Sequence, residues 1–270
     1  MTNPAPVLKY PGSKWRLAKW IIGHFPAHAT YLEPFFGSGA VLFTKPPSKV
    51  ETVNDLNNQV ANLFRVLRER PEELAALVDM TPWSREEYNL SYELIGDPLE
   101  DARRFLVRCW QGRYTKLVHR TGWRYEINAD AGKVTSWDKL PNRILEAATR
   151  LKQVQIENRP ALEVIEIHKY HGVLIYADPP YSLSTRAQKI YANEMTDTDH
   201  LELLDALDMH PGPVVLSGYM CDLYDERLRH WTRRTRGARA ETGDARTEVL
   251  WINPVAAKFL QVRLFDEVIQ

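Results

Sequence analysis

Short hydrophobic runs and helical hydrophobic spacing alternate along most of the chain. The short runs predict β-strands over residues 30–33, 50–53, 154–157, 172–177, 213–217, 248–252 and 259–264. The run at 172–177 is almost entirely apolar, which is typical of a strand buried on both faces of a sheet. Helical spacing predicts helices over residues 14–25, from 40 to 43, and over 161–169, 197–209 and 223–229. Such alternation predicts an α/β sheet.

The middle of the chain has a different pattern. Hydrophobic residues at helical spacing predict helices over residues 57–79, 84–95, 98–110 and 141–151, with an irregular segment at 111–137. We therefore predict one discontinuous α/β domain, residues 1–56 and 156–270. A mostly helical insert, residues 57–155, interrupts it.

A glycine turn follows the first predicted strand, in the sequence Glu-Pro-Phe-Phe-Gly-Ser-Gly at residues 33–39. Glycines at this spacing let a backbone approach a ligand closely, and the helix that follows offers free N–H groups. Asp55 ends the next strand, where such folds place a carboxylate that accepts hydrogen bonds from ribose hydroxyls. Leu42 replaces the third glycine of the dinucleotide fingerprint, which disfavours NAD or FAD. A purely structural turn is the alternative.

The strongest chemical signal is Asp178-Pro179-Pro180-Tyr181, directly after the most hydrophobic strand. Open α/β sheets keep their active sites at this end of their strands. Prolines fix the backbone and lack N–H donors, so the carbonyl groups stay available as acceptors. A carboxylate and a carbonyl that accept both N–H bonds of an aromatic amine make its nitrogen more nucleophilic. The alternative is a strand-ending turn capped by Asp178.

Four segments together resemble the Dam-type class of N6-adenine DNA methyltransferases. They are residues 8–14 (LKYPGSK), 33–39 (EPFFGSG), 53–57 (VNDLN) and 178–181 (DPPY), in the family's order. The resemblance implies a Rossmann-like methyltransferase sheet with a target-recognition insert. It also implies S-adenosylmethionine as cofactor and a flipped adenine in double-stranded DNA as target.

The resemblance also implies roles for individual residues. Asp178, Pro179, Pro180 and Tyr181 would form the catalytic turn, with Asp178 on the target amine and Tyr181 stacked on the base. The implied cofactor site consists of Tyr10, Lys14, Glu33, Phe35, Gly37, Gly39, Asp55, Asn158 and Asp178. For Lys14, the alternative is a solvated lysine at the start of a helix.

Positive charge is concentrated in the insert, although 35 Lys and Arg balance 35 Asp and Glu overall. Between Asp101 and Glu126 the chain has no acidic residue, and aromatic residues lie among the cations. This pattern is typical of a nucleic-acid surface. The predicted DNA-binding residues are Arg103, Arg108, Arg113, Lys116, Arg120, Arg124 and, in the polar loop 182–196, Arg186. A second basic patch covers residues 227–239. A solvated basic helix is the alternative for either patch.

Other features narrow the function classes. Two cysteines give no disulfide framework, and His119, His168, His200 and His210 lack metal-ligand spacing, so we expect no metal. No apolar run reaches the roughly 20 residues of a membrane span, and no signal peptide is evident, so we expect a cytoplasmic protein of a bacterial or phage-infected cell. The alternatives to adenine methylation are cytosine-N4 methylation, protein-glutamine or RNA methylation, and inactive DNA binding. A cognate restriction enzyme is a possible partner.

Overall fold

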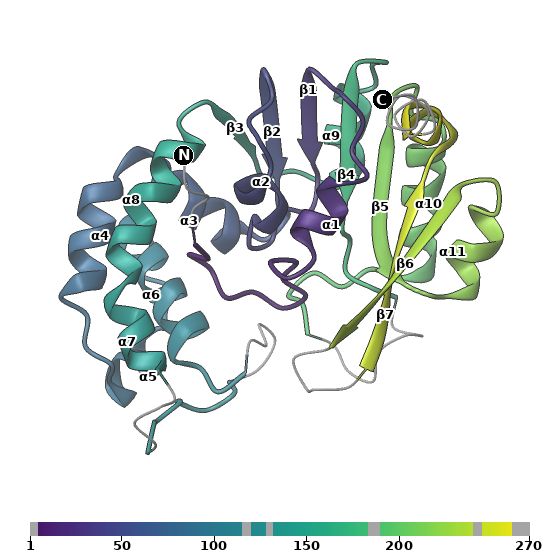
Figure 1. Cartoon of the computed structure of the whole chain (residues 1–270). Coiled ribbons are helices and arrows are strands. Elements are labelled where there is room, and N and C mark those ends of the chain that lie inside the picture. Colours follow the sequence, from purple (N-terminus) through teal and green to yellow (C-terminus); the bar gives the residue numbers. More distant parts are fainter. Residues whose placement is uncertain (1–4, 115–119, 128–131, 183–189, 240–244, 261–270) are drawn as a thin grey trace, which may run out of the picture.

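The computed structural model describes residues 5–114, 120–127, 132–182, 190–239 and 245–260 (Figure 1). Within them, seven strands form one sheet in the order β3-β2-β1-β4-β5-β7-β6. All neighbours from β3 to β5 are parallel, whereas β7 is antiparallel to both β5 and β6. The strands are β1 (Thr30–Glu33), β2 (Val50–Asn54), β3 (Val154–Glu157), β4 (Val173–Ala177), β5 (Val214–Tyr219), β6 (Thr232–Arg239) and β7 (Ala245–Ile252).

The strand order reverses direction between β1 and β4. From β1 the chain proceeds outward to β2 and β3, whereas β4 and β5 extend the sheet the other way. The two connections therefore diverge at this point and leave a crevice outside the carboxyl ends of the strands. All five residues of β4 are buried, as its hydrophobic run predicts.

Side-chain alternation along β4 divides the core between the two faces of the sheet. Leu174 and Tyr176 belong to the same cluster as residues of α1 (Ala18–Ile22) and α2 (Ala40–Thr44). Ile175 and Ala177 join a second cluster on the opposite face. That cluster includes residues of α9 (Ala161–Ile167), α10 (Asp197–Asp208) and α11 (Asp222–Arg227). The result is a sheet with helices on both faces.

A group of helices lies at the β3 end of the sheet, to the left in Figure 1. They are α3 (Asn58–Glu69), α4 (Pro71–Asp79), α5 (Arg85–Leu90), α6 (Pro98–Gln111), α7 (Lys133–Asp138) and α8 (Leu140–Leu151). Their core is continuous with that of the sheet, since Phe105 and Ile144 share a cluster with Val53. Val154 already belongs to β3, so the sheet resumes just inside the predicted insert. Division of the chain into two domains therefore stays a prediction.

Three predicted helices are shorter in the structure. The helix expected at 84–95 is α5, which ends at Leu90. The expected helix at 57–79 is two helices, because Pro71 lacks the N–H needed to continue α3 and instead begins α4. The expected helix at 14–25 is reduced to α1, which turn residues 15–17 precede. Among the described residues, none of the helices combines the length and the hydrophobicity of a membrane span.

The predicted final strand at 259–264 is wrong where the structure describes it. Residues 254–260 form a helix, and residues 261–264 lie outside the described residues. The Asn253 side chain starts this helix by accepting a hydrogen bond from the backbone N–H of Ala256 at 2.9 Å. The strand that pairs with β7 is instead β6, so the second basic patch is largely an edge strand rather than a helix.

Candidate active site

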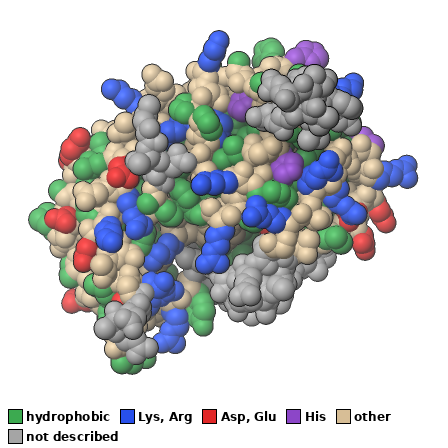
Figure 2. Space-filling model, viewed as in Figure 1, with side chains coloured by type: hydrophobic (Ala, Val, Ile, Leu, Met, Phe, Trp, Pro, Cys, Tyr) green, Lys and Arg blue, Asp and Glu red, His purple; other side chains and the backbone are tan. Residues whose placement is uncertain are grey.

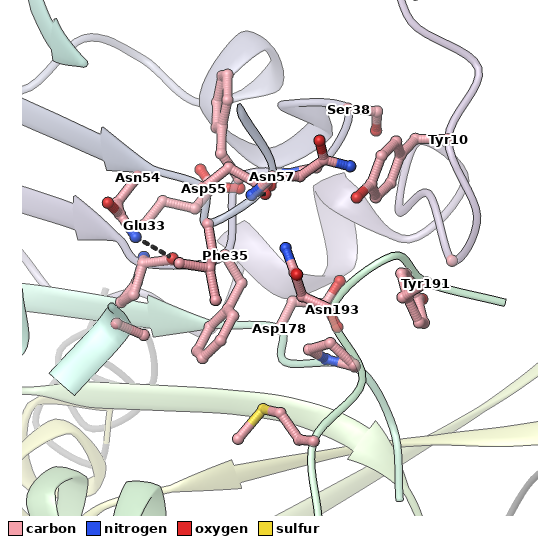
Figure 3. Close-up of a pocket in the computed structure, with 18 of the residues that line it drawn as sticks. Tyr10, Glu33, Phe35, Ser38, Asn54, Asp55, Asn57, Asp178, Tyr191 and Asn193 are labelled. Carbon is pink, nitrogen blue, oxygen red and sulfur yellow. Dashed lines mark hydrogen bonds between the residues drawn. The ribbon is translucent and has the colours of Figure 1, made fainter. Parts of the chain in front are cut away.

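A pocket of about 280 Å³ lies at the carboxyl ends of β1, β2 and β4 (Figure 3). Each strand contributes one acidic residue to its wall: Glu33 at the end of β1, Asp55 after β2 and Asp178 after β4. Tyr10 and Tyr191 lie on the opposite side of the view from Glu33. The structure thus brings together three carboxyl groups that are up to 145 positions apart in the sequence (33 to 178).

The glycine turn orients Asp55. The backbone N–H groups of Gly37 and Asn57 donate to the two carboxylate oxygens of Asp55, each at 2.8 Å. Gly37 has φ 51°, a backbone conformation that side-chain-bearing residues rarely adopt, and a Cβ there would lie 3.2 Å from the Tyr10 ring. The turn therefore holds a carboxylate in the pocket, and Tyr10, Phe35 and Gly37 lie in the wall beside it.

Gly39 has a different environment from Gly37. It precedes α2 with φ 68°, and a Cβ there would overlap the rings of Phe36 and Phe43. Among the described residues that line the pocket, Ala40 and Val41 are present but Gly39 is not. Gly39 therefore allows the Phe36 and Phe43 rings to pack beneath the turn and does not form part of the pocket surface.

Burial changes the proton affinity of two pocket acids. Glu33 is buried and accepts a 2.8 Å hydrogen bond from the Tyr31 hydroxyl; burial raises its pKa to about 8. Burial also raises the pKa of Asp55 to about 6, although the N–H groups of Asn57 and Gly37 oppose the shift. Both carboxyl groups therefore take up protons near neutral pH when nothing cationic lies beside them.

The Asp178 carboxylate is held from two sides. Lys14 Nζ lies 2.9 Å from Asp178 Oδ2, and Ser217 Oγ on β5 donates to Oδ1 at 2.8 Å. Lys14 Nζ also donates to the Gly12 carbonyl at 2.8 Å. Burial favours the neutral form of Lys14, but the charges of Asp178 and Glu248 more than offset it and raise its pKa. The interpretation of Lys14 as a solvated lysine is therefore wrong.

The rest of the Asp-Pro-Pro-Tyr turn is only partly on the pocket surface. Of the described residues in the turn, Asp178 and Pro180 line the pocket, whereas Pro179 and Tyr181 do not. Tyr181 is buried, with its hydroxyl donating to Glu248 and its ring 4.5 Å from that of Tyr219 between centroids. Stacking of Tyr181 on a base stays a prediction.

The expected contact through Asn158 is not part of the pocket wall. Its side chain is exposed and donates to the Asp55 carbonyl at 2.7 Å. Pro160, Ala161 and Leu162 line the pocket nearby instead. Asn158 thus connects the loop after β3 to the loop after β2, and any contact with a cofactor through it stays a prediction.

Several site residues carry no local sequence signal. Ser217 and Glu248 lie on β5 and β7 and reach the site only through the sheet order. The segment before α10 and its first turns add Asn193, Glu194, Met195, Asp199, Glu202 and Leu203 to the wall. Asn54 is the exception, because it lies beside Asp55 in a recognisable motif. The Asn54 side-chain amide donates hydrogen bonds to the Pro34 and Arg159 carbonyls at 2.9 and 3.0 Å.

Two of the predicted DNA-binding arginines have side-chain partners on other helices. Arg103 forms ion pairs with Glu87 and Glu100 at 2.7 and 2.6 Å, and its side chain is only 12% exposed. Arg108 is half-buried and donates to Gln59 Oε1 at 2.5 Å. The sequence of residues 101–126 could not reveal these partners, because Glu87, Glu100 and Gln59 lie outside that range. The structure therefore assigns both side chains to contacts between helices.

The arginines after α6 are more accessible. Arg113 and Arg120 are exposed, and Arg124 is half-buried. Arg113 lies over the Tyr125 ring at 5.8 Å and Arg120 over the Tyr92 ring at 4.7 Å. Lys116 and Arg186 lie outside the described residues. Figure 2 shows Lys and Arg side chains across the middle and lower left of this face, whereas Asp and Glu lie towards its margins.

Comparison with known proteins agrees with this geometry. The chain is 26% identical to the Type II methyltransferase M1.LlaDCHI of Lactococcus lactis subsp. cremoris over 276 aligned positions, which cover 93% of this chain and 96% of the relative. Residues 10–240 match the family described as D12 class N6 adenine-specific DNA methyltransferase. That range includes all three pocket carboxylates, the helices α3 to α8 and the Asp-Pro-Pro-Tyr turn. The chain therefore belongs to the D12 class of N6 adenine-specific DNA methyltransferases.

Proposed function

We propose that the pocket binds S-adenosylmethionine and that Asp178 binds the N6 amine of the target adenine. N6-adenine methylation of DNA is the activity of the family. The observation that carries the assignment of residues is the position of Asp178 on the wall of the same pocket as Gly37 and Asp55. A methyl donor in that pocket would face the Asp178 carboxylate.

The polar and apolar groups that line the pocket fit this cofactor. Asp55 offers carboxylate oxygens to ribose hydroxyls, and its orientation is already fixed by two backbone N–H groups. Glu33 is a buried carboxyl group that a cationic ligand would stabilise in its ionised form. Phe35 and Leu162 offer apolar surface for a purine. The bound cofactor would supply a methyl group on a positively charged sulfur.

Asp178 would make the adenine amine reactive. The N6 lone pair is delocalised into the purine ring, so the amine is a poor nucleophile. Hydrogen bonds from both N–H groups to the Asp178 carboxylate and a main-chain carbonyl of the turn favour a pyramidal nitrogen. Ser217 would keep the carboxylate in place through its 2.8 Å hydrogen bond. N6 would take the methyl group that the bound cofactor supplies, and the amine would release one proton to water.

We infer that the substrate is double-stranded DNA and that the adenine leaves the helix. In a duplex, N6 is paired and stacked, so an enzyme must extrude the base to reach it. Arg113, Arg120 and Arg124 on one side, with Arg234 and Arg236 of β6 on the other, offer charge for backbone phosphates. Because the substrate is DNA, we place the protein in the cytoplasm. The relative's designation as a Type II methyltransferase supports a cognate restriction enzyme as partner.

Product analysis tests the proposal. The protein is incubated with duplex DNA and methyl-labelled S-adenosylmethionine, and the DNA is then digested to nucleosides. We expect label on N6-methyldeoxyadenosine only. Label confined to N4-methyldeoxycytidine, or to protein or RNA added in parallel reactions, would contradict the assignment of the amine.

A further inference from the structure

Asp178 already has a cationic partner, and this raises a problem for the target amine. Lys14 Nζ is 2.9 Å from Asp178 Oδ2, while Oδ1 accepts a hydrogen bond from Ser217. An amine that donates to this carboxylate must therefore compete with a buried ammonium group. A positive charge beside the amine also opposes the positive charge that N6 acquires during attack. A second carboxylate that takes over the charge of Lys14 would remove both obstacles.

Glu248 lies within reach of the same ammonium group. Its Oε1 is 3.6 Å from Lys14 Nζ, so a shift of about 0.7 Å would equal the 2.9 Å contact with Asp178. Both carboxylates are shielded from water, with side chains 4% and 17% exposed for Glu248 and Asp178. The Gly12 carbonyl holds the ammonium at 2.8 Å and could stay bound during such a shift.

Glu248 is also connected to the catalytic turn. The Tyr181 hydroxyl donates to Glu248 Oε1, the same oxygen that faces Lys14. Lys14 Nζ lies 4.8 Å above the centre of the Tyr181 ring. Glu248 is on β7, which β5 separates from β4, and it does not line the pocket. One carboxylate two strands from β4 thus contacts both Lys14 and Tyr181.

We propose that Glu248 is a positioning residue that takes over the charge of Lys14 when the target amine binds Asp178. The ammonium moves from Asp178 Oδ2 towards Glu248 Oε1, and the vacated oxygen accepts an N–H bond of the amine. The inference rests on the proposed role of Asp178. A simpler role, in which Glu248 only accepts the Tyr181 hydrogen bond, makes a different prediction because it does not need a charge.

The test compares Glu248→Gln with Glu248→Asp. Gln keeps an oxygen for the Tyr181 hydroxyl but removes the charge, whereas Asp keeps the charge on a shorter side chain. We expect Glu248→Gln to lower kcat by about 10-fold to 100-fold, with affinities for S-adenosylmethionine and for duplex DNA within about twofold of the unmodified protein. Glu248→Asp is expected to recover part of the lost kcat.

Glu51→Gln is the matched control. Like Glu248, Glu51 is a buried glutamate that faces a lysine; its cationic partners are Lys45 and Arg150. Glu51 does not line the pocket. We expect this control to lower the Tm and leave kcat unchanged. Unchanged kcat in Glu248→Gln would overturn the inference, as would equal losses in the Gln and Asp variants. Asp178→Ala distinguishes failure of the proposed function from failure of the role proposed for Glu248. If Asp178→Ala stays active, the proposed function is wrong. If Asp178→Ala is inactive while Glu248→Gln has normal activity, only the role of Glu248 is wrong.

Discussion

Two single residues, the pocket acids Glu33 and Asp55, make the stability of the protein depend on pH. The pKa of Glu33 is raised to about 8 and that of Asp55 to about 6, in both residues by burial. The folded protein therefore holds these protons more tightly than the unfolded chain does. Below the unfolded pKa of about 4 to 4.5, both states are protonated and the raised values cost nothing. As the pH rises towards 8, the folded protein loses stability relative to the unfolded chain.

Glu33→Gln should separate the two effects. The amide cannot ionise, and its oxygen can still accept the Tyr31 hydrogen bond. We expect the Tm of the ligand-free variant at pH 8 to exceed that of the unmodified protein by roughly 2 to 8 °C, and the difference to shrink at pH 5. Cofactor affinity should fall, because a carboxylate is lost from the pocket. Thermal unfolding at both pH values and calorimetric titration measure this; parallel pH dependences of the two Tm values would refute it.

At the element scale, the junction between the glycine turn and α2 depends on Gly39. Gly39→Ala places a Cβ against the rings of Phe36 and Phe43 at φ 68°. We expect a loss of about 1 to 3 kcal/mol in the free energy of unfolding, because positive φ and overpacking both act against the methyl group. Gly172→Ala is the control, because a Cβ added at Gly172 would meet no heavy atom within 4 Å apart from its chain neighbours, and the φ of Gly172 is not positive. Urea unfolding measures both, and equal stabilities of the two variants would contradict this role.

Sequence pattern predicts elements well where hydrophobic burial decides their formation. The runs at 30–33, 50–53, 154–157, 172–177 and 213–217 correspond to β1 to β5. Pattern fails at β6, because an edge strand exposed to solvent can be almost entirely polar. The apolar residues near 259 suggested a strand, but the cap at Asn253 starts a helix there. Local hydrogen bonds and sheet position decided these two segments.

At the scale of the whole molecule, basic residues from separate elements would share the DNA backbone. Arg113 follows α6, whereas Arg236 lies on β6 in register with Glu248 and over the Trp20 ring of α1. None of the ion pairs within the described ranges involves Arg113 or Arg236. We expect Arg113→Ala and Arg236→Ala each to reduce the slope of log affinity against log salt by about 1.

Arg70→Ala is the control for the DNA surface. Arg70 is exposed but paired with Glu73 at 2.6 Å, at the junction of α3 and α4. Its removal should leave the salt slope unchanged. DNA titrations at several salt concentrations give the slopes, and cofactor titration checks that the pocket is intact. If neither Arg113→Ala nor Arg236→Ala changes the slope of log DNA affinity against log salt, neither residue contacts the DNA backbone.

The site as a whole is predictable from sequence only where strand ends carry motifs. Glu33, Asp55 and Asp178 could be placed together, since parallel strands present their carboxyl ends at one edge. Ser217 and Glu248 could not, because nothing local marks a residue that acts across two strands. The ion pair of Arg103 with Glu87 could not be predicted for the same reason, because Glu87 comes from another helix; a role of Arg103 in DNA binding stays a prediction. Long-range contacts decide which charges remain available.

The proposed chemistry depends on the Asp178 carboxylate, which would make the adenine amine reactive beside the pocket. The most direct measurement pairs methyl transfer to duplex DNA with calorimetric binding of S-adenosylmethionine, for Asp178→Ala and the isosteric Asp178→Asn. We expect transfer to fall by at least about 100-fold in both variants, while cofactor affinity is largely retained. Transfer at the rate of the unmodified protein in either variant would contradict it.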